Sequence, residues 1–418
     1  MKRTRKDFKR LALFAALVCA AACLQTHAAD QVPRWIATWG AAQQTPEPRN
    51  ALPAKDLQDA TVRQIFHLSV AGRTLRVKVS NAFGTAPLHF TSVHIARPLA
   101  ADAPAIDPAS DRALSFAGAP DVLVPAGAEY LSDPIDYPVD ALSNLAVTFH
   151  LDNAPQGETG HPGSRATTYL VHGNAVGAAN FSSPEKVDHW YQIAEIDVQG
   201  SPQAGTVVTL GDSITDGHAS TTNGNDRWPD VLARRLQQSP ATRALGVVNK
   251  GIGGNRLLID GLGPNALARF DRDVLAPAGV RWLIVLEGVN DLGTQMEHGD
   301  VSKAQHEDLT HRIIAAYQQI IDRAHAHGIR VTGGTITPFG GSMYDHPGTL
   351  TEAERQAINA WIRAPGHFDS VVDFDAVVRD PHHPERLLPA YDCGDHLHPS
   401  PVGYRAMGEA IPLTLFER

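Results

Sequence analysis

The sequence contains few cysteines: Cys19, Cys23 and Cys393 are the three in 418 residues. We expect the first two to be removed with an N-terminal segment, which leaves Cys393 alone. A single cysteine cannot form an internal disulfide, so the protein must be stable on its hydrophobic core. For Cys393 itself, two residues before Asp395, the expectation is a small, buried, apolar side chain.

The chain also lacks a surplus of basic residues. Its 36 lysines and arginines are outnumbered by 45 acidic residues, and the formal net charge is −9. A nucleic-acid-binding protein needs basic residues to neutralise phosphates, so we expect no nucleic-acid partner. The 43% of hydrophobic residues are enough for a sizeable core. At about 100–200 residues per domain, the length suggests two domains.

No apolar run is long enough to span a bilayer comfortably; the longest, Leu11 to Leu24, has fourteen residues. A basic stretch precedes this run, and small residues around Ala28 follow it, so the pattern predicts a signal peptide over residues 1–28. An N-terminal membrane anchor is the alternative. Cleavage removes six basic residues and one acidic residue, which leaves a net charge of −14. We expect an exported protein, periplasmic or secreted, without stable membrane insertion.

Two regions with different periodicity flank the breaker-rich stretch 200–205, which is typical of a linker. In residues 30–200, apolar side chains alternate with period two at 62–70 and 75–79, which predicts a hairpin. The same alternation recurs at 145–151, and loops with short strands are expected between. The pattern predicts an all-β sandwich or jelly roll.

Residues 206–418 alternate short apolar strands with helices. The predicted strands are 207–210, 247–248, 283–286, 329–331 and 371–374, and the predicted helices include 228–236 and 309–321. Continuous apolar strands between helices favour a parallel sheet covered on both faces, an α/β fold. Functional groups in such folds gather at the carboxyl ends of the strands.

Two polar runs follow the first two of these strands. Ser213 lies in Gly211-Asp212-Ser213-Ile214, where it is either a nucleophile or part of an ordinary turn. The second run spans 249–255 and contains Gly251 and Gly253, but the third glycine of a dinucleotide fingerprint is replaced by Arg256, so no nucleotide cofactor is predicted. A glycine in this run can expose a backbone N–H to a bound oxygen.

Two more runs follow later strands. The Asn290 amide, in the run 287–291, can donate a hydrogen bond to a developing oxyanion, with a structural turn as the alternative. In the run 392–400, His398 can accept the Ser213 proton while Asp395 fixes its tautomer. His396, His398, Asp392 and Asp395 are also possible metal ligands, which stays an alternative. The chain has no Gly-x-Ser-x-Gly elbow, which disfavours an α/β-hydrolase.

On these four motifs, residues 206–418 resemble the SGNH family, also called GDSL hydrolases. The resemblance implies a flavodoxin-like three-layer α/β/α fold and ester hydrolysis through an acyl-enzyme, with no metal or organic cofactor. It implies that Ser213, Asp395 and His398 are catalytic. It also implies an oxyanion hole of the Ser213 and Gly254 N–H groups and the Asn290 amide, with Gly253 as the alternative to Gly254.

The region from Trp35 to Gly84 resembles the β-domain of some exported members of this family, which often act on esterified carbohydrates. The stretch 216–226 is polar and small, unlike the apolar rim expected of a lipase. We therefore predict an exported serine esterase that removes short acyl groups, such as acetyl, from carbohydrate or similar polar alcohols, including polysaccharide esters. The alternatives are a general carboxylesterase or lipase for longer acyl chains, and a non-catalytic glycan-binding or adhesion module.

Overall fold

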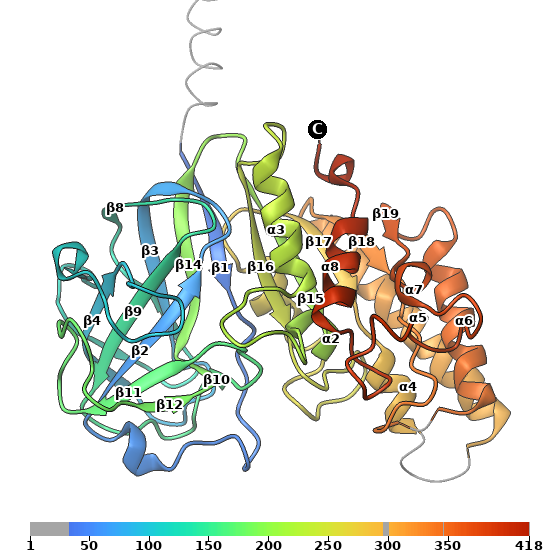
Figure 1. Ribbon diagram of the computed structural model, residues 1–418, viewed down its shortest axis with the longest axis horizontal. Helices are drawn as coiled ribbons and strands as arrows, with labels where there is room; N and C mark the ends of the chain where they lie inside the picture. The colour runs from blue at the N-terminus through green and yellow to red at the C-terminus, as the bar shows by residue number, and fades with distance from the viewer. Residues whose placement is uncertain (1–32, 296–300, 346, 418) are drawn as a thin grey trace, which may run out of the picture.

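The computed structural model describes residues 33–295, 301–345 and 347–417. The predicted signal peptide, residues 1–28, lies outside this range. No described helix combines the length and apolar character that a membrane crossing requires. Figure 1 shows the strands of the N-terminal part (33–200) on one side of the molecule and the helices of the C-terminal part (205–417) on the other.

The N-terminal part consists largely of two antiparallel sheets, as the alternating apolar pattern predicted. Both sheets contribute inward side chains to one apolar core, for example Val77 and Ile196 from the first and Phe66 and Phe149 from the second. The arrangement is therefore a β-sandwich. The first sheet contains β1 (Arg34–Gly40), β14 (Ile193–Gly200), β3 (Gly72–Ser80), β7 (Glu129–Leu131) and β8 (Ile135–Val139). The second contains β12 (Glu185–Val187), β11 (Thr168–His172), β2 (Ala60–His67), β9 (Asn144–Leu151), β4 (Leu88–Ala96), β5 (Arg112–Ala113) and β6 (Val122–Val124).

The remaining elements of this part are short. Strands β10 (Gly160–His161) and β13 (Trp190–Tyr191) form a separate antiparallel pair, and η1 (Ala54–Leu57) and η2 (Pro108–Ser110) are 3-10 helices.

The predicted hairpin between 62–70 and 75–79 is wrong. Strand β2 pairs with β9 and β11, whereas β3 pairs with β14 in the other sheet. The backbone changes partners in the connection: the N–H of Leu68 donates to Ser143 beside β9, and the N–H of Ser69 donates to Thr38 in β1. The chain thus crosses from one layer of the sandwich to the other. Both connections give the same period-two alternation, so the pattern could not distinguish them.

The C-terminal part has a five-stranded sheet in which all pairs are parallel, ordered β16-β15-β17-β18-β19. The strands are β15 (Gly205–Gly211), β16 (Leu245–Gly251), β17 (Val280–Leu286), β18 (Arg330–Gly334) and β19 (Ser370–Val372). Numbered along the chain, this is the 2-1-3-4-5 order of a flavodoxin-like sheet, so the predicted fold is confirmed. The order reverses at β15, and the register places Gly211 level with Gly251 and Leu286. Three of the predicted polar runs therefore leave the sheet at one edge.

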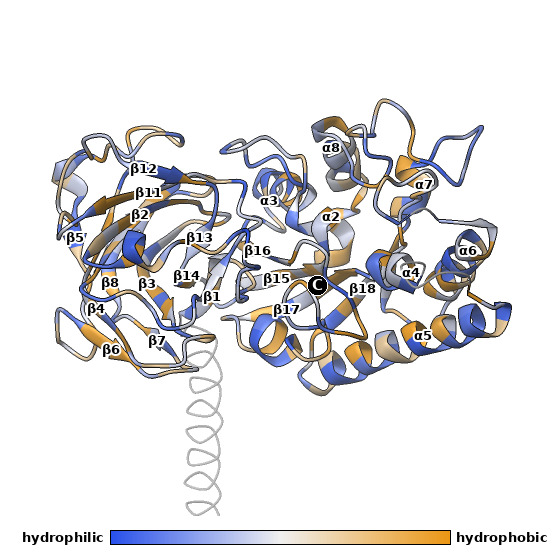
Figure 2. Ribbon diagram, turned by 90° about the horizontal axis from the view of Figure 1, so that it is seen from below, coloured by the Kyte–Doolittle hydropathy of each residue, from blue (hydrophilic) through white to orange (hydrophobic). Residues whose placement is uncertain are grey.

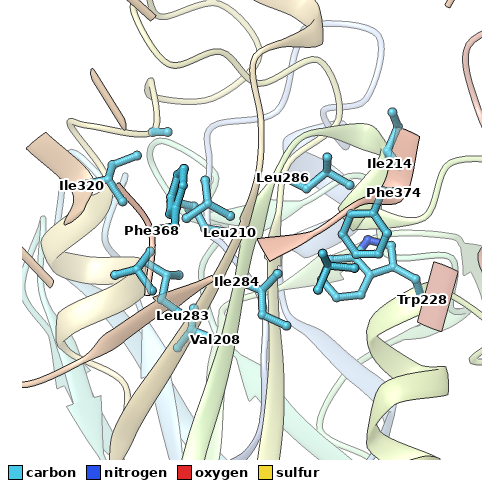
Figure 3. Packing of buried hydrophobic residues seen from close by; sticks show 14 of the residues in the cluster. Val208, Leu210, Ile214, Trp228, Leu283, Ile284, Leu286, Ile320, Phe368 and Phe374 are labelled. Carbon is cyan, nitrogen blue, oxygen red and sulfur yellow. The ribbon is translucent and has the colours of Figure 1, made fainter. Parts of the chain in front are cut away.

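Helices cover both faces of this sheet. Figure 3 shows Ile320 and Phe368 on one side of the central strands and Trp228 and Phe374 on the other. In Figure 2, hydrophobic and hydrophilic residues alternate along the ribbon of α5, as expected for a helix with one face on a sheet. The longer helices are α3 (Trp228–Gln238), α5 (Lys303–Ala326), α6 (Thr349–Arg363) and α8 (Pro401–Ala410). The shorter ones are α2 (Ser213–Asp216), α4 (Val289–Gln295), α7 (Phe374–Val378), the π-helical turn η3 (Asp271–Leu275) and the 3-10 helix η5 (Leu413–Phe416).

The last predicted strand, 371–374, ends two residues early. Asp373 instead caps α7, since its side chain accepts a hydrogen bond from the N–H of Ala376, and Phe374 is the first residue of that helix. Aspartate is a favoured N-cap, which explains the change of structure at this position.

The two parts meet along β16, the edge strand of the parallel sheet. The N–H of Val247 in β16 donates to Ser69 Oγ at 2.9 Å, and Lys250 Nζ donates to the carbonyl of Ala41 at 2.9 Å. Strand edges that stay open can pair with other chains, and here the N-terminal part occupies that edge.

Candidate active site

The chain leaves β15 through a short helical turn, α2, that begins at Ser213. Asp212 caps this turn, because its Oδ1 accepts a hydrogen bond from the N–H of Ile214 at 2.9 Å. Gly211 must be a glycine, since a Cβ there would lie 2.3 Å from the carbonyl oxygen of Leu286. These contacts fix the serine at the carboxyl edge of the sheet.

Ser213, His398 and Asp395 form one hydrogen-bonded line. Ser213 Oγ lies 2.7 Å from His398 Nε2, and His398 Nδ1 lies 2.6 Å from Asp395 Oδ2. An ionised carboxylate only accepts hydrogen bonds, so Nδ1 carries the proton and Nε2 accepts from the Ser213 hydroxyl. Ser213 and His398 are 6% and 5% exposed. A base for the serine proton is therefore in place, with its tautomer set by the carboxylate.

The backbone holds Asp395 in turn. Its Oδ1 accepts hydrogen bonds from the N–H groups of Leu397 at 3.0 Å and His398 at 2.8 Å. Burial would raise the pKa of Asp395, but the hydrogen bonds from the His398 ring and from these N–H groups lower it well below its usual value. The carboxylate is therefore charged at neutral pH.

Gly254 occupies a tight turn that follows β16. The N–H of Asn255 donates to the carbonyl of Ile252 at 3.1 Å, and Gly254, the third residue of this turn, has a φ of 73°. A Cβ at Gly254 would lie 2.2 Å from Leu262, whereas one at Gly253 would have its nearest contact at 3.8 Å. Of the two glycines, the turn thus requires Gly254. No described residue accepts a hydrogen bond from the Gly254 N–H.

Asn290 lies in α4, a few residues past the end of β17. Its Nδ2 donates to the backbone carbonyl of Asn255 at 2.9 Å. An asparagine amide has two N–H donors, so one positions the side chain and the other stays available to a ligand. Asn290, Gly254 and Ser213, which the sequence analysis assigned to one site, all line one cavity.

This cavity has a volume of about 690 Å³, within the range of small-molecule sites. Both parts of the chain line it. The N-terminal part contributes Gln44, Glu47, Arg49, Asn50, Pro162, Gly163, Arg165, Asp188 and His189. The C-terminal part contributes Ser213, Asp216, His218, Gly253, Gly254, Arg256, Leu262, Asn290, Thr294, Tyr344, Asp345, Leu397 and His398.

A second histidine, which the sequence analysis did not single out, packs on His398. The ring centroids of His218 and His398 are 4.0 Å apart. Arg165 Nη2 lies 3.0 Å from His218 Nδ1, and because arginine can only donate, this ring nitrogen must accept. Burial, followed by the neighbouring His398 and Arg165, lowers the pKa of His218 to about 4. His218 is therefore neutral, with its proton on Nε2, which lies 3.9 Å from Asp395.

A buried contact joins the two parts beside the serine. Asp216, the last residue of α2, lies 2.8 Å from His161 Nε2 of β10, and His161 Nδ1 bonds the carbonyl of Ala42. Both side chains are almost fully buried. The stretch 216–226 shows only its polarity in the sequence, because a pairing between residues 55 positions apart leaves no local pattern.

Ionisable groups lie buried beneath the site. Burial raises the pKa of Asp212 to about 7 and that of Asp291 to about 6, and it raises the pKa of Glu287 well above its usual value. Arg269 lies among them, 3.8 Å from Glu287, and donates to the carbonyl of Gly211 at 3.0 Å. It thereby ties the end of β15 to this cluster.

The expectation of a buried Cys393 is wrong: the residue is exposed, in the loop before Asp395.

Of the alternative metal ligands, His396 pairs with Asp392, with 2.6 Å between Nδ1 and the carboxylate oxygen, and its side chain is 54% exposed. Both ring nitrogens of His398 are engaged by Ser213 and Asp395. A metal at His398 would have to displace one of these partners.

A serine hydroxyl, an imidazole and a carboxylate in line, at the carboxyl edge of a doubly wound sheet, are typical of the class of serine hydrolases. The GDSL-like lipase/acylhydrolase family matches residues 209–406. The C-terminal part of the chain is thus a domain of this family, as its four motifs indicated, and the protein is a carboxylic ester hydrolase.

Solved structures include several similar domains. A protein from Desulfitobacterium hafniense described as lipolytic and of the G-D-S-L family is 23% identical, over 49% of this chain and 96% of that chain, with a TM-score of 0.36. An acetyl xylan esterase from Geobacillus stearothermophilus is 21% identical over 51% and 96%, with a TM-score of 0.36. A GDSL-like lipase from Bacteroides thetaiotaomicron is 19% identical over 49% and 84%, with a TM-score of 0.34. No curated protein matches the chain.

Proposed function

We propose that the protein is an exported serine esterase that removes short acyl groups, such as acetyl, from carbohydrate or similar polar alcohols. The observation that carries the chemistry is the line from Ser213 Oγ through His398 to Asp395, which opens into the cavity shared with Gly254 and Asn290. Of the residues in this proposal, Ser213, Gly254 and Asn290 follow the ends of β15, β16 and β17, which lie level at one edge of the sheet.

His398 Nε2 takes the proton of Ser213 as the hydroxyl oxygen attacks the ester carbonyl. Negative charge then develops on the carbonyl oxygen, which accepts hydrogen bonds from the Ser213 and Gly254 N–H groups and from the Asn290 amide. The charged Asp395 stabilises the imidazolium. His398 returns the proton to the departing alcohol, and water repeats the two steps on the acyl-enzyme to release the acid.

The cavity supports a polar substrate. Only a few of its lining side chains are apolar, among them Pro162, Leu262 and Leu397, and the others are mostly charged or amide groups. A long acyl chain needs an extended apolar wall to bury its methylene groups, at about 0.8 kcal/mol each. A short acyl group on a polar alcohol fits this lining better.

A chromogenic acetyl ester tests the chemistry. We expect the Ser213→Ala variant to lose turnover while its circular dichroism spectrum stays that of the folded protein. Unchanged activity in this variant would remove Ser213 from the mechanism, and loss of activity on chelation would favour the metal alternative. No turnover by the unaltered protein on any ester would favour a binding module.

Two further measurements address the substrate and the location. Rates on esters from acetyl to palmitoyl should fall with acyl chain length, and acetylated polysaccharide is assayed beside them. A maximum at long chains would indicate a lipase.

Export predicts that the protein isolated from the periplasm or medium begins near residue 29. A product that retains residues 1–28 in a membrane fraction would indicate an anchor.

A further inference from the structure

The acidic and basic side chains around the cavity differ in how many hydrogen-bond partners they have within the protein. Four carboxylates line it, those of Glu47, Asp188, Asp216 and Asp345, and each is within hydrogen-bond distance of a neighbouring side chain. These acids are therefore engaged within the protein. Their presence does not by itself indicate a cationic ligand.

The three arginines of the lining, Arg49, Arg165 and Arg256, leave most of their N–H donors without a partner among the described residues. Among the described residues, the side chains of Arg49 and Arg256 make no hydrogen bond or ion pair, and Arg165 has only the bond to His218. The Nε groups of Arg165 and Arg256 are shielded from solvent and have no acceptor. A guanidinium has five N–H donors, and a shielded donor without an acceptor is costly. An anionic ligand in the cavity would supply acceptors.

The position of Arg165 is fixed by the backbone. Its φ is 49°, which is unusual for a residue other than glycine, and its carbonyl accepts a hydrogen bond from the N–H of Asn223 at 2.9 Å. Asn223 Oδ1 in turn accepts from the N–H of Thr167 at 2.8 Å. The C-terminal part thus holds the turn of the N-terminal part that carries Arg165. Such strained, well-supported positions are common at ligand sites.

The contacts of Arg165 indicate which half of the ester it faces. It bonds His218, and the His218 ring packs on His398, the group that protonates the departing alcohol in the proposed mechanism. The alcohol part of the ester must therefore lie on this side of Ser213. We propose that Arg165 recognises a negative charge on the alcohol part, so that the preferred substrates are acyl esters of acidic alcohols, such as acylated uronic-acid units. This inference rests on the proposed esterase function.

Matched esters test the proposal. The anionic probe is 4-acetoxybenzoate, and its methyl ester is the neutral match with the same acetyl group and leaving oxygen. We expect the ratio of kcat/KM for the anionic probe to that for the neutral probe to fall about tenfold in Arg165→Gln, because one charge-assisted hydrogen bond is lost. Arg165→Lys keeps the charge and should recover part of the ratio.

Arg73→Gln provides the matched control, because it removes the same charge from an exposed site outside the cavity. Its ratio should equal that of the unaltered protein. Succinate monophenyl ester carries its negative charge on the acyl part, and phenyl butyrate is its neutral match. Arg165→Gln should leave the ratio of kcat/KM for these two esters unchanged.

An unchanged acetoxybenzoate ratio in Arg165→Gln would overturn the proposal, and so would an effect confined to the succinate ester. If the unaltered protein hydrolyses neither acetoxybenzoate nor its methyl ester, the proposed function itself fails. That result differs from hydrolysis of both probes with a ratio that does not depend on Arg165.

Discussion

The Asp395 carboxylate accepts three hydrogen bonds in this site. One of its oxygens accepts from the His398 ring, and the other accepts two backbone N–H groups. We expect Asp395→Asn to lower kcat by roughly 1,000- to 10,000-fold, because the neutral amide neither fixes the tautomer nor stabilises the imidazolium. KM should change little, since Asp395 does not line the cavity. Steady-state kinetics on an acetyl ester measure both constants.

Asp392→Asn is the control for this prediction. Asp392 lies in the same loop, and its carboxylate accepts backbone N–H groups and pairs with His396 rather than His398. We expect the Asp392→Asn variant to keep most of the activity of the unaltered protein. An equal loss in both variants would show that the loop conformation, and not the charge of Asp395, had been disturbed.

At the scale of secondary-structure elements, Arg269 connects the ends of the strands beneath the site. It is 1% exposed and donates to the carbonyls of Gly211 in β15 and Lys250 in β16. It also pairs with Asp273 at 3.0 Å. Removing one partner of a buried ion pair typically costs about 3–5 kcal/mol, so Arg269→Met should lower the free energy of unfolding by about that amount. Chemical denaturation at pH 7 measures this difference.

Arg272, three residues after Arg269 in the chain, offers a comparison. It also bonds Asp273, at 3.1 Å, but its side chain is 26% exposed. Water can replace part of what Arg272→Met removes, so its loss of stability should be clearly smaller. If the two variants were equally destabilised, burial of the Arg269 guanidinium would not be the cause.

The elements themselves could be predicted to different degrees from the sequence. The strands 207–210 and 283–286 are apolar runs in a segment that alternates strands with helices, and their parallel pairing follows from that alternation. The connection between β2 and β3 could not be predicted, because a hairpin and a crossing between sheets leave the same pattern. The polar runs at the strand ends could be recognised because each combines turn residues with a chemically useful group.

At the scale of the whole molecule, the cavity could not be predicted from either part alone. The sequence indicated Ser213, Gly254, Asn290 and His398, which all come from the C-terminal part. The opposite wall comes from loops of the sandwich, among them the turn with Arg165. Contacts of this kind join residues far apart in sequence, and they depend on how the two parts pack rather than on any periodicity.

The packing of the two parts can be tested at Gly246 in β16. A Cβ at this position would lie 2.1 Å from the carbonyl oxygen of Ala37 in β1, which is backbone and cannot move aside alone. Gly246→Ala must therefore push the sandwich away from the edge of the parallel sheet. Overpacking of this kind costs about 1–3 kcal/mol, and we expect a lower free energy of unfolding together with weaker binding of substrate in the shared cavity.

Gly177→Ala is the matched control, because a Cβ there would have an ordinary contact of 3.7 Å, with Asp111. Denaturation curves and KM values should separate the two variants, with Gly177→Ala close to the unaltered protein in both. If Gly246→Ala lost stability but kept its KM, the cavity would not depend on how the sandwich seats against β16. If it lost neither, the close approach of β1 to β16 would not constrain the molecule.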